Sequence, residues 1–221
     1  MLLLAFDTAT PAVTAALHDG DRVLAERSTV DARRHGELLA PHIADVLAAA
    51  GVGPPDIGLI AVGVGPGPFT GLRVGVVTAR VMALALGIDA VGVPTLDVLA
   101  AEAVWAGDVR DSFLVATDAR RREVHWAAYD VVDGRAVCTD GPHVSAAADV
   151  PVGGRPVVGR GADLYAEQLG PRVGPADPSA AVLAAYAGQQ LAAGRPLLEA
   201  VPLYLRRPDA AVPGPAKAVR A

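Results

Sequence analysis

The stretch LLLAFDTATPAVTAAL, residues 2–17, decides the fold of this chain. It reads as an apolar strand that ends at Asp7, a polar turn at 8–11, and a second apolar strand. The stretch FLVATDARRREVHWAA, residues 113–128, repeats this order of strand, acid, turn and strand. An Asp-Gly turn then leads each half into a third strand. The sequence therefore predicts a duplicated three-stranded unit, although the internal repeat is weak.

The remaining elements follow from helical spacing and short apolar runs. Helices are expected at 34–50 and 70–86, ended by Gly51 and Gly87 respectively. The other expected elements are strands at 57–64, 90–93 and 156–158, and helices at 95–105, 162–169 and 178–193. This order predicts an α/β fold with mixed sheets flanked by helices. We expect an N-terminal lobe at 1–106, a smaller C-terminal lobe at 107–205, and a disordered Pro- and Ala-rich tail at 206–221.

Composition narrows the function classes. The 221 residues carry a net charge of −5 and 52% hydrophobic side chains, which allows a core and lacks the basic character of a nucleic-acid-binding domain. Cys138 is the only cysteine, which excludes an intramolecular disulfide and a cysteine-rich zinc site. The chain has no uninterrupted run of about 18 apolar residues and no basic start typical of a signal peptide. We expect a cytoplasmic protein without membrane contact.

The densest basic patch is Arg120, Arg121 and Arg122, in the turn after the repeated acid. Three arginines in a turn are more often a solvated loop than an RNA site. RNA contact through these side chains is kept as the alternative.

The glycine-rich stretch GVGPGPFTGLRVG, residues 63–75, lies between a predicted strand and a predicted helix. It lacks the Gly-Lys-Ser/Thr of a Walker A loop and a strict dinucleotide-binding fingerprint. Its prolines remove backbone donors, although Gly67 and the following helix start retain some. Asp7 and Thr8 end the first strand, where sheet folds place ligands, so Asp7, Thr8 and Gly67 are the candidate phosphate turn. The competing interpretation is that Asp7 only caps a turn.

The helix after this loop has a stripe of small residues at every fourth position: Gly71, Gly75, Ala79 and Ala83. Small residues let another backbone approach closely. The stripe could face the protein's own core, or the helix could contact its core on one side and a partner protein on the other. His35 and His42, seven apart in the preceding helix, lack the spacing of a zinc-binding pair, and no serine has a hydrolase context.

Six segments carry a resemblance to a known family. They are LLLAFDTATPAVTAAL, RRHGELLAPHI, GVGPGPFTGLRVGVVTARVMALALG, VPTLDVLA, DARRREVHWA and PLYLR, which together extend over nearly the whole chain to about residue 206. In this order they resemble the bacterial TsaB family, with GPGPFTGLRVG as the most specific block. The resemblance implies the actin, sugar kinase and Hsp70 superfamily. It therefore implies a duplicated actin-like (ribonuclease H-like) ATPase fold with a reduced second lobe.

The resemblance also implies a function. TsaB is similar to its paralogue TsaD, the metal-containing enzyme that joins a threonylcarbamoyl group to adenosine in tRNA, and the two act with the ATPase TsaE. The product lies next to the anticodon of tRNAs reading codons that start with A. We expect a non-catalytic subunit that binds and activates TsaD, contacts tRNA through the complex, and forms a homodimer when alone. The alternatives are a free-standing degenerate ATPase, a metallopeptidase-like enzyme, or a plain homodimeric binding module.

One comparison within the resemblance bears on catalysis. TsaD-like proteins carry two metal-binding histidines four apart in the segment that resembles GIDAVGVPTLDVLA, residues 87–100. The matching positions here are Thr95 and Leu99, so we expect no metal, no catalytic residue and no required cofactor. Whether ATP or ADP binds between subunits stays open.

The resemblance also places the partner interface. The family's contact is a bundle of helices from the two N-terminal lobes, here the helices at 35–50 and 70–86. The residues expected at this interface are His35, Leu38, Leu39, His42, Gly71, Leu72, Arg73, Gly75, Ala79, Met82 and Ala83.

Overall fold

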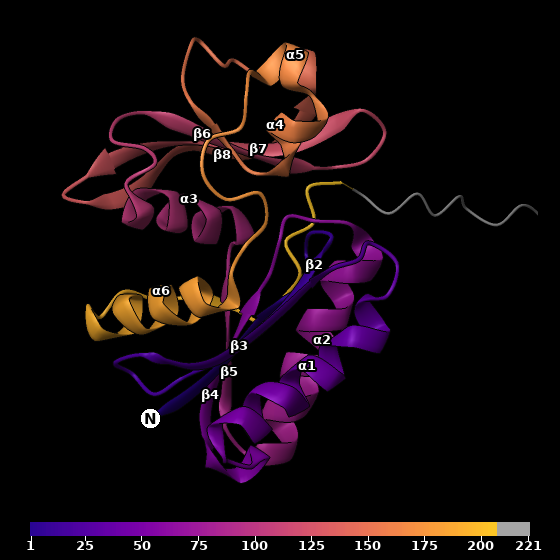
Figure 1. Cartoon of the computed structure of the whole chain (residues 1–221), viewed down its shortest axis with the longest axis vertical. Coiled ribbons are helices and arrows are strands. Elements are labelled where there is room, and N and C mark those ends of the chain that lie inside the picture. Colours follow the sequence, from indigo (N-terminus) through magenta and orange to yellow (C-terminus); the bar gives the residue numbers. More distant parts are fainter. Residues whose placement is uncertain (207–221) are drawn as a thin grey trace, which may run out of the picture.

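The computed structural model describes residues 1–206 as two stacked lobes, each built on one mixed sheet (Figure 1). Residues 207–221 of the predicted tail lie outside the described residues. Arg206, the first residue of that predicted tail, is held in place. Its Nη1 donates to the carbonyl of Ala119 at 3.1 Å, and its guanidinium pairs with Glu123.

The first sheet has six strands in the order β10-β5-β4-β1-β2-β3. They are β1 (Leu2–Asp7), β2 (Ala12–His18), β3 (Val23–Val30), β4 (Ile57–Gly63), β5 (Asp89–Val93) and β10 (Leu198–Glu199). β1 lies antiparallel to β2 and parallel to β4, so the chain makes a meander and then crosses over through helices. The two-residue strand β10 was not predicted.

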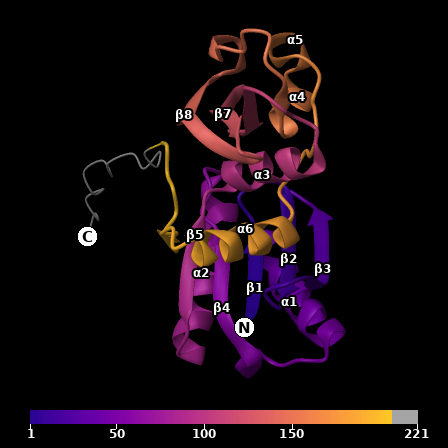
Figure 2. The ribbon, with the colours of Figure 1, turned by 90° about the vertical axis from the view of Figure 1, so that its left-hand side faces the viewer.

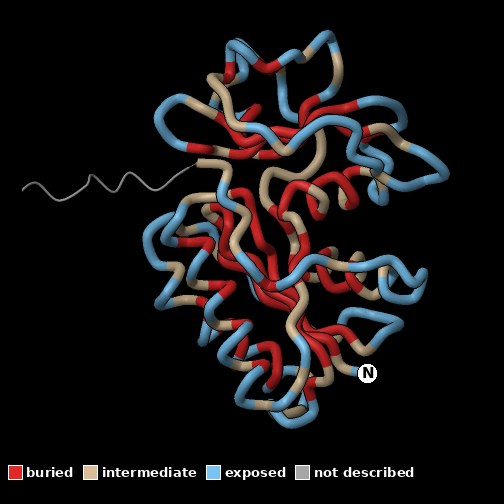
Figure 3. Tube along the Cα trace, turned by 180° about the vertical axis from the view of Figure 1, so that it is seen from behind, coloured by how far each residue is buried: buried red, intermediate tan, exposed pale blue. Residues whose placement is uncertain are grey.

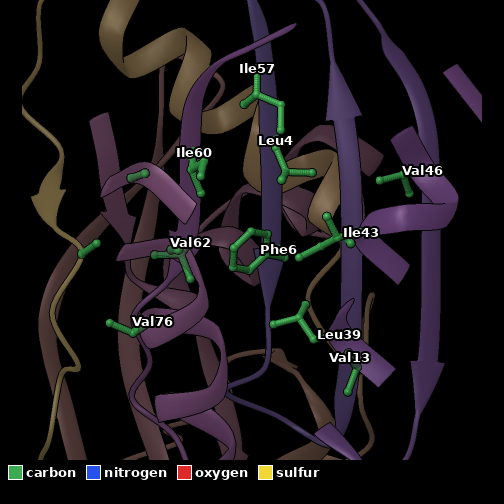
Figure 4. Close-up of a cluster of buried hydrophobic side chains, with 14 of the residues drawn as sticks. Leu4, Phe6, Val13, Leu39, Ile43, Val46, Ile57, Ile60, Val62 and Val76 are labelled. Atoms are coloured by element: carbon green, nitrogen blue, oxygen red, sulfur yellow. The ribbon is translucent and has the colours of Figure 1, made fainter. Parts of the chain in front are cut away.

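Alternation along β1 gives the first sheet two buried faces. Leu4 and Phe6 point to the face covered by α1 (His35–Ala50) and α2 (Phe69–Leu86), as Figure 4 shows. Leu3 and Ala5 point to the opposite face, which is covered by α6 (Ala180–Ala192). Buried residues accordingly follow the strands, while the outer sides of the helices are exposed (Figure 3).

The second sheet repeats this plan with four strands in the order β8-β7-β6-β9. They are β6 (Phe113–Asp118), β7 (Glu123–Val132), β8 (Arg135–Ala146) and β9 (Val157–Val158). β6, β7 and β8 form an antiparallel meander, and β9 lies parallel to β6 as β4 does to β1. The predicted duplication of the three-stranded unit is confirmed.

The helices of the second lobe cover both faces of its sheet. α3 (Thr95–Ala106) packs on the face that carries Phe113 and Val115. The opposite face is covered by α4 (Arg160–Leu164), α5 (Ala166–Leu169) and the short helix η2 (Ala147–Asp149); another short helix, η1 (Pro54–Asp56), precedes β4. The single helix predicted at 162–169 is wrong, because the backbone leaves helical geometry at Tyr165, with φ −131° and ψ 44°.

Three elements pack across the division expected between residues 106 and 107. α6 and β10 follow the second sheet in the chain, yet both belong to the first lobe. α6 packs on one face of the first sheet and β10 pairs with its strand β5, while α3 packs on the second sheet (Figure 2). The start of α6 is held by polar contacts to the first sheet. Thr14 Oγ1 accepts the amide of Ala180 at 3.1 Å, and Glu26 accepts the hydroxyl of Ser179 at 2.8 Å. As a result α3 and α6 lie between the two sheets (Figure 1).

Candidate functional site

Asp7, at the end of β1, is fully buried and both its oxygens are engaged. Oδ1 accepts the amide of Ala9 at 2.6 Å, and Oδ2 accepts the hydroxyl of Thr95 at 2.7 Å. Thr95 Oγ1 in turn accepts the amide of Gly65 at 3.1 Å. Asp7 thus joins its own turn to the glycine-rich loop and to the start of α3. These contacts correspond to the turn-capping interpretation of Asp7.

Burial changes the acidity of this carboxyl. Removal from water raises the pKa of Asp7 from 3.8 to about 6, although the Ala9 amide, the Thr95 hydroxyl and nearby His35 favour the charged form. The carboxyl therefore protonates near pH 6.

Thr8 is buried beside Asp7 and connects the turn to α2. Its hydroxyl donates to the carbonyl of Gly71 at 2.7 Å and accepts the amide of Gly75 at 2.9 Å. The one proton of the hydroxyl is therefore engaged within the protein and is not available to a phosphate.

Close approach explains the glycines of the 63–75 stretch. A Cβ on Gly63 would lie 1.8 Å from Asp7 Oδ2, and one on Gly67 would lie 2.2 Å from the Ala9 carbonyl oxygen. A Cβ on Gly71 would lie 2.7 Å from the Thr8 carbonyl oxygen, and one on Gly75 would lie 2.6 Å from Thr8 Oγ1. The loop and α2 therefore fill the first turn of the sheet with protein atoms. Among the three candidate phosphate residues, Gly67 lines a pocket next to Phe69 and Arg120.

The small-residue stripe of α2 faces the protein's own core. Gly71, Gly75, Ala79 and Ala83 are buried. Their side of the helix packs on the turn after β1 and on the face of the first sheet, so the core interpretation of the stripe is the correct one. In the structure these four residues pack against the protein itself and offer little surface to a partner, since Ala79 is fully buried and Ala83 is 6% exposed. Their contact with a partner stays a prediction.

The other residues expected at the interface fall into three groups by exposure. Leu39, His42 and Leu72 are buried; Leu38, His35 and Met82 are half-buried, and Arg73 is exposed. Both histidines form hydrogen bonds within the protein. His35 Nε2 lies 2.8 Å from the Thr10 carbonyl oxygen, and His42 Nε2 lies 3.0 Å from Thr29 Oγ1.

The region matching the metal-binding segment of TsaD-like proteins is part of the packing. Leu99 is fully buried in the cluster under the second sheet, and the hydroxyl of Thr95 is occupied by Asp7 and Gly65. Within residues 1–206 no group of three or more His, Cys, Asp or Glu side chains is placed to hold a metal ion.

The outward face of α2 is the feature that the stripe argument missed. We call this surface the α2 face and define it by its exposed apolar side chains, Phe69, Val77, Val81 and Leu84, which are 44%, 51%, 59% and 85% exposed. Arg73 and Arg80 are exposed on the same side. Helical spacing of these positions was present in the sequence, but an apolar helix gives no sign of which side meets its own core.

α2 also passes a test for membrane spans. Among the described residues it is the one helix long and apolar enough to cross a membrane by length and composition, with a mean hydropathy of 1.5. Core helices meet the same criteria. The small-residue stripe on one side of α2 packs on the turn after β1. The opposite side of the helix is the exposed α2 face.

Known proteins similar to this chain were found in sequence and in structure. Residues 22–168 match the family model of TsaD, tRNA N6-adenosine threonylcarbamoyltransferase. An uncharacterized protein of Mycobacterium tuberculosis is 47% identical over 211 residues, which cover 94% of this chain and 93% of that protein.

Two further relatives decide the subfamily. The structure of YeaZ from Pseudomonas aeruginosa superposes with a TM-score of 0.78 at 32% identity, covering 92% of this chain and 99% of that one. The Escherichia coli tRNA threonylcarbamoyladenosine biosynthesis protein TsaB is 38% identical over 129 residues, 58% of this chain and 55% of that protein. The chain belongs to the TsaB family. Its two mixed sheets flanked by helices form an actin-like fold, in which the second lobe is reduced to a sheet of four strands.

Proposed function

We propose that this chain is a non-catalytic subunit of the machinery that forms threonylcarbamoyladenosine in tRNA, and that it binds and activates a TsaD-type catalytic paralogue in the cytoplasm. The observation that carries the proposal is the α2 face, an exposed apolar surface on a helix whose other side is fully occupied. The relatives in Escherichia coli and Bacillus subtilis are both named tRNA threonylcarbamoyladenosine biosynthesis proteins, which supports this process for the chain. The TsaD family match supports a partner of related fold.

The first turn of the sheet supports a non-catalytic role. A catalytic carboxylate needs an open position beside it for substrate or metal, and both oxygens of Asp7 are taken by protein donors. Thr95 and Leu99 stand at the two positions where TsaD-like proteins hold metal, and neither offers an imidazole. We propose that the chain requires no cofactor for its own part of the process.

The α2 face has the chemistry of a helix-docking surface. Its four apolar side chains recur along one side of the helix, and burying a side chain such as Leu84 contributes about 1.5–3 kcal/mol. Arg73 lies over the ring of Phe69 at 5.0 Å, which places a cation at one end of the face. A partner helix with apolar residues and carboxylates at its edge would complement this surface.

The direct test of docking uses matched substitutions. Leu84→Asp should weaken binding to the purified TsaD-type paralogue by about thirtyfold or more, because the most exposed apolar side chain of the α2 face is replaced by a charge. Leu191→Asp on α6 is the control, since Leu191 is exposed to 41% on a different helix. Calorimetry measures both affinities, and circular dichroism checks folding. Equal affinities for the two variants would contradict docking through the α2 face.

The function itself is tested by reconstitution. Threonylcarbamoyladenosine formation on tRNA is measured with the catalytic paralogue, the TsaE-type ATPase and the enzyme that supplies the activated carbamoyl donor, with and without this chain. We expect product only when the chain is present and no hydrolysis of ATP or peptides by the chain alone. Equal product without it would overturn the proposal. A homodimer that Leu84→Asp dissolves would place self-association on the same surface, in competition with the partner.

A further inference from the structure

A pocket of about 300 Å³ lies where α3, α6 and the β7–β8 hairpin meet. Its volume is at the lower end of the range of small-molecule sites, which suits a compact ligand. It shares no lining residue with the pocket beside Phe69 and Arg120, and none with the α2 face. We call it the Trp105 pocket; the lining residues used below are Trp105, Arg135, Tyr186, Gln189, Gln190 and Arg195.

Two helices supply most of the pocket wall. α3 and α6 lie next to each other between the two sheets (Figure 1). On α3, Trp105 comes four residues after Ala101, so both lie on one side of the helix. On α6, Tyr186, Gln189 and Gln190 have the spacing i, i+3, i+4 and also share one side. The wall therefore stands on rigid elements, which hold side chains more precisely than loops do.

Two tight turns place an arginine each at this pocket. Arg135 directly follows the β7–β8 hairpin turn at 133–134, whose two residues have positive φ, 50° and 72°, as the favoured two-residue hairpin turn requires. Arg195 follows Gly194, which has φ 66° at the end of α6. The amide of Arg195 donates to the carbonyl of Gln190 at 2.9 Å, which is the closing bond of a Schellman motif. The backbone at both arginines is thus held by hydrogen bonds.

The charge of the lining is positive. Arg135 and Arg195 are its charged members, in a chain whose net charge is −5. Within residues 1–206 neither arginine pairs with a carboxylate. Arg195 Nη1 donates to Gln190 Oε1 at 3.3 Å, and the Arg135 guanidinium makes no hydrogen bond in that part of the chain. Two guanidinium groups at one pocket without a carboxylate favour an anionic ligand.

The neutral lining groups supply further donors. The indole N–H of Trp105, the hydroxyl of Tyr186 and the side-chain amide of Gln189 form no hydrogen bond among the described residues. Burial raises the pKa of Tyr186 to about 12, with Asp97 adding to the rise and Arg195 opposing it, so the hydroxyl keeps its proton at neutral pH. Guanidinium and indole groups donate and do not accept, so a ligand rich in acceptor atoms would complement this lining.

Trp105 gives the pocket a flat apolar wall. Its side chain is 39% exposed, although tryptophan has more apolar surface to bury than any other residue. The other tryptophan of the chain, Trp126, is 6% exposed, and its Nε1 donates to Ser145 at 3.0 Å. Exposed Trp, Tyr and Arg side chains that share one pocket are the residue types that dominate binding energy at interfaces. The ligand should therefore have an apolar body as well as a charge.

We propose that the Trp105 pocket binds an organic carboxylate with a flat apolar body, with the carboxylate at Arg135 and Arg195 and the apolar body against the Trp105 ring. Planar guanidinium groups match the geometry of a carboxylate, and the small volume suits an acid built on one ring. The chemistry is the same whether the acid is free or is the carboxyl-terminal residue of a peptide. The inference goes beyond the proposed function, because docking through the α2 face requires no ligand in this pocket.

The experiment adds benzoate to the isotope-labelled full chain and follows its two indole N–H resonances by NMR. The Trp105 resonance should shift and saturate, because its ring lines the pocket. The Trp126 resonance is the internal control and should stay in place, since that side chain is buried and its Nε1 is bonded to Ser145. Trp105→Phe removes one of the two resonances and so assigns both.

The variants test the two arginines. Arg195→Gln and Arg135→Gln should each weaken benzoate binding by about tenfold, the effect of losing one hydrogen bond to a charged group. Arg22→Gln is the matched control, because Arg22 lies in the β2–β3 turn, outside this pocket, and its side chain is 81% exposed. All three arginines are exposed, so circular dichroism should show the parent fold in every variant.

The probes test the two parts of the ligand. Benzamide has the ring without the charge and should bind about tenfold more weakly than benzoate. Inorganic phosphate has charge without an apolar body and should also bind more weakly. A tripeptide that ends in phenylalanine, with a free carboxylate, distinguishes the sources of the acid.

Each outcome supports or overturns the proposal. Tighter binding of the tripeptide than of benzoate assigns a peptide terminus, and equal or weaker binding assigns a free acid. The proposal is overturned if millimolar benzoate causes no saturable shift of the Trp105 resonance, or if Trp126 shifts alike. It is also overturned if benzamide or phosphate binds as tightly as benzoate, or if Arg22→Gln weakens binding as much as Arg195→Gln. The isolated chain is used throughout, so these results do not depend on docking or on reconstitution.

Discussion

Gly75→Ala should lower the free energy of unfolding by about 2–3 kcal/mol, although alanine is the better helix former. The new Cβ would lie 2.6 Å from Thr8 Oγ1 and 3.5 Å from a methyl of Val62. Thr8 cannot rotate away cheaply, because its hydroxyl holds both the Gly71 carbonyl and the Gly75 amide in a buried position. Helix α2 must therefore move off the sheet or lose these bonds.

A second helical glycine provides the matched control. Gly188 lies inside α6, and a Cβ there would meet no atom within 4 Å. Gly188→Ala should therefore raise the free energy of unfolding by up to about 1 kcal/mol, through helix propensity alone. Urea unfolding followed by circular dichroism measures both variants. If Gly75→Ala were as stable as Gly188→Ala, the close contact between α2 and the β1 turn would not exist in solution.

Acidification from pH 7 to 5 should destabilise Asp7→Asn by about 1 kcal/mol more than it destabilises the parent chain. The native pKa of Asp7, about 6, lies above its ordinary value of 3.8, so the native state binds the proton more tightly than the unfolded chain. The stability that this proton contributes is complete below about pH 4 and is lost as pH rises through 6. The parent gains it on acidification, and the asparagine variant cannot.

The contribution of His125 to the pH dependence of stability has the opposite sign. Burial lowers the pKa of His125 from 6.5 to about 4, so the unfolded chain takes up the proton first and stability is lost as pH falls below 6.5. His125→Gln should therefore be spared about 2 kcal/mol of the loss that the parent suffers between pH 7 and 5. In the parent the two effects partly cancel.

Unfolding curves of the parent and both variants at pH 7 and pH 5 check these signs. Glu102, whose pKa burial raises to about 7, is present in all three chains and so drops out of the differences. If Asp7→Asn and His125→Gln shifted the pH dependence in the same direction, one of the two burial arguments would be wrong.

Local signals in the sequence were sufficient to predict most of the helices and strands. Helices α1 and α2 end at Gly51 and Gly87, as the glycines indicated, and both glycines have left-handed φ. The acid-ended strands β1 and β6 follow directly from their apolar runs. Two short features escaped: β10 is too brief to show a pattern, and the break at Tyr165 leaves apolar spacing unchanged.

The candidate site was harder, because its residues are distant in the chain. The sequence placed Asp7, Thr8 and the glycine loop near one another through their positions at strand ends, and those segments do meet. It did not reveal that Thr95, 88 positions from Asp7, occupies the carboxylate. Nor did it show that the ring of Tyr204 stacks on the ring of Phe69.

The sequence by itself determined the strand order of each repeated unit, the ends of α1 and α2, and the apolar character of α2, because these depend on neighbours within a few residues. Only the tertiary structure decided which side of α2 is core. The four small residues and the four exposed apolar ones both have helical spacing, and nothing local distinguishes them. The distinction comes from the turn after β1, which approaches so closely that glycine alone fits, and which leaves Val77, Val81 and Leu84 facing outward.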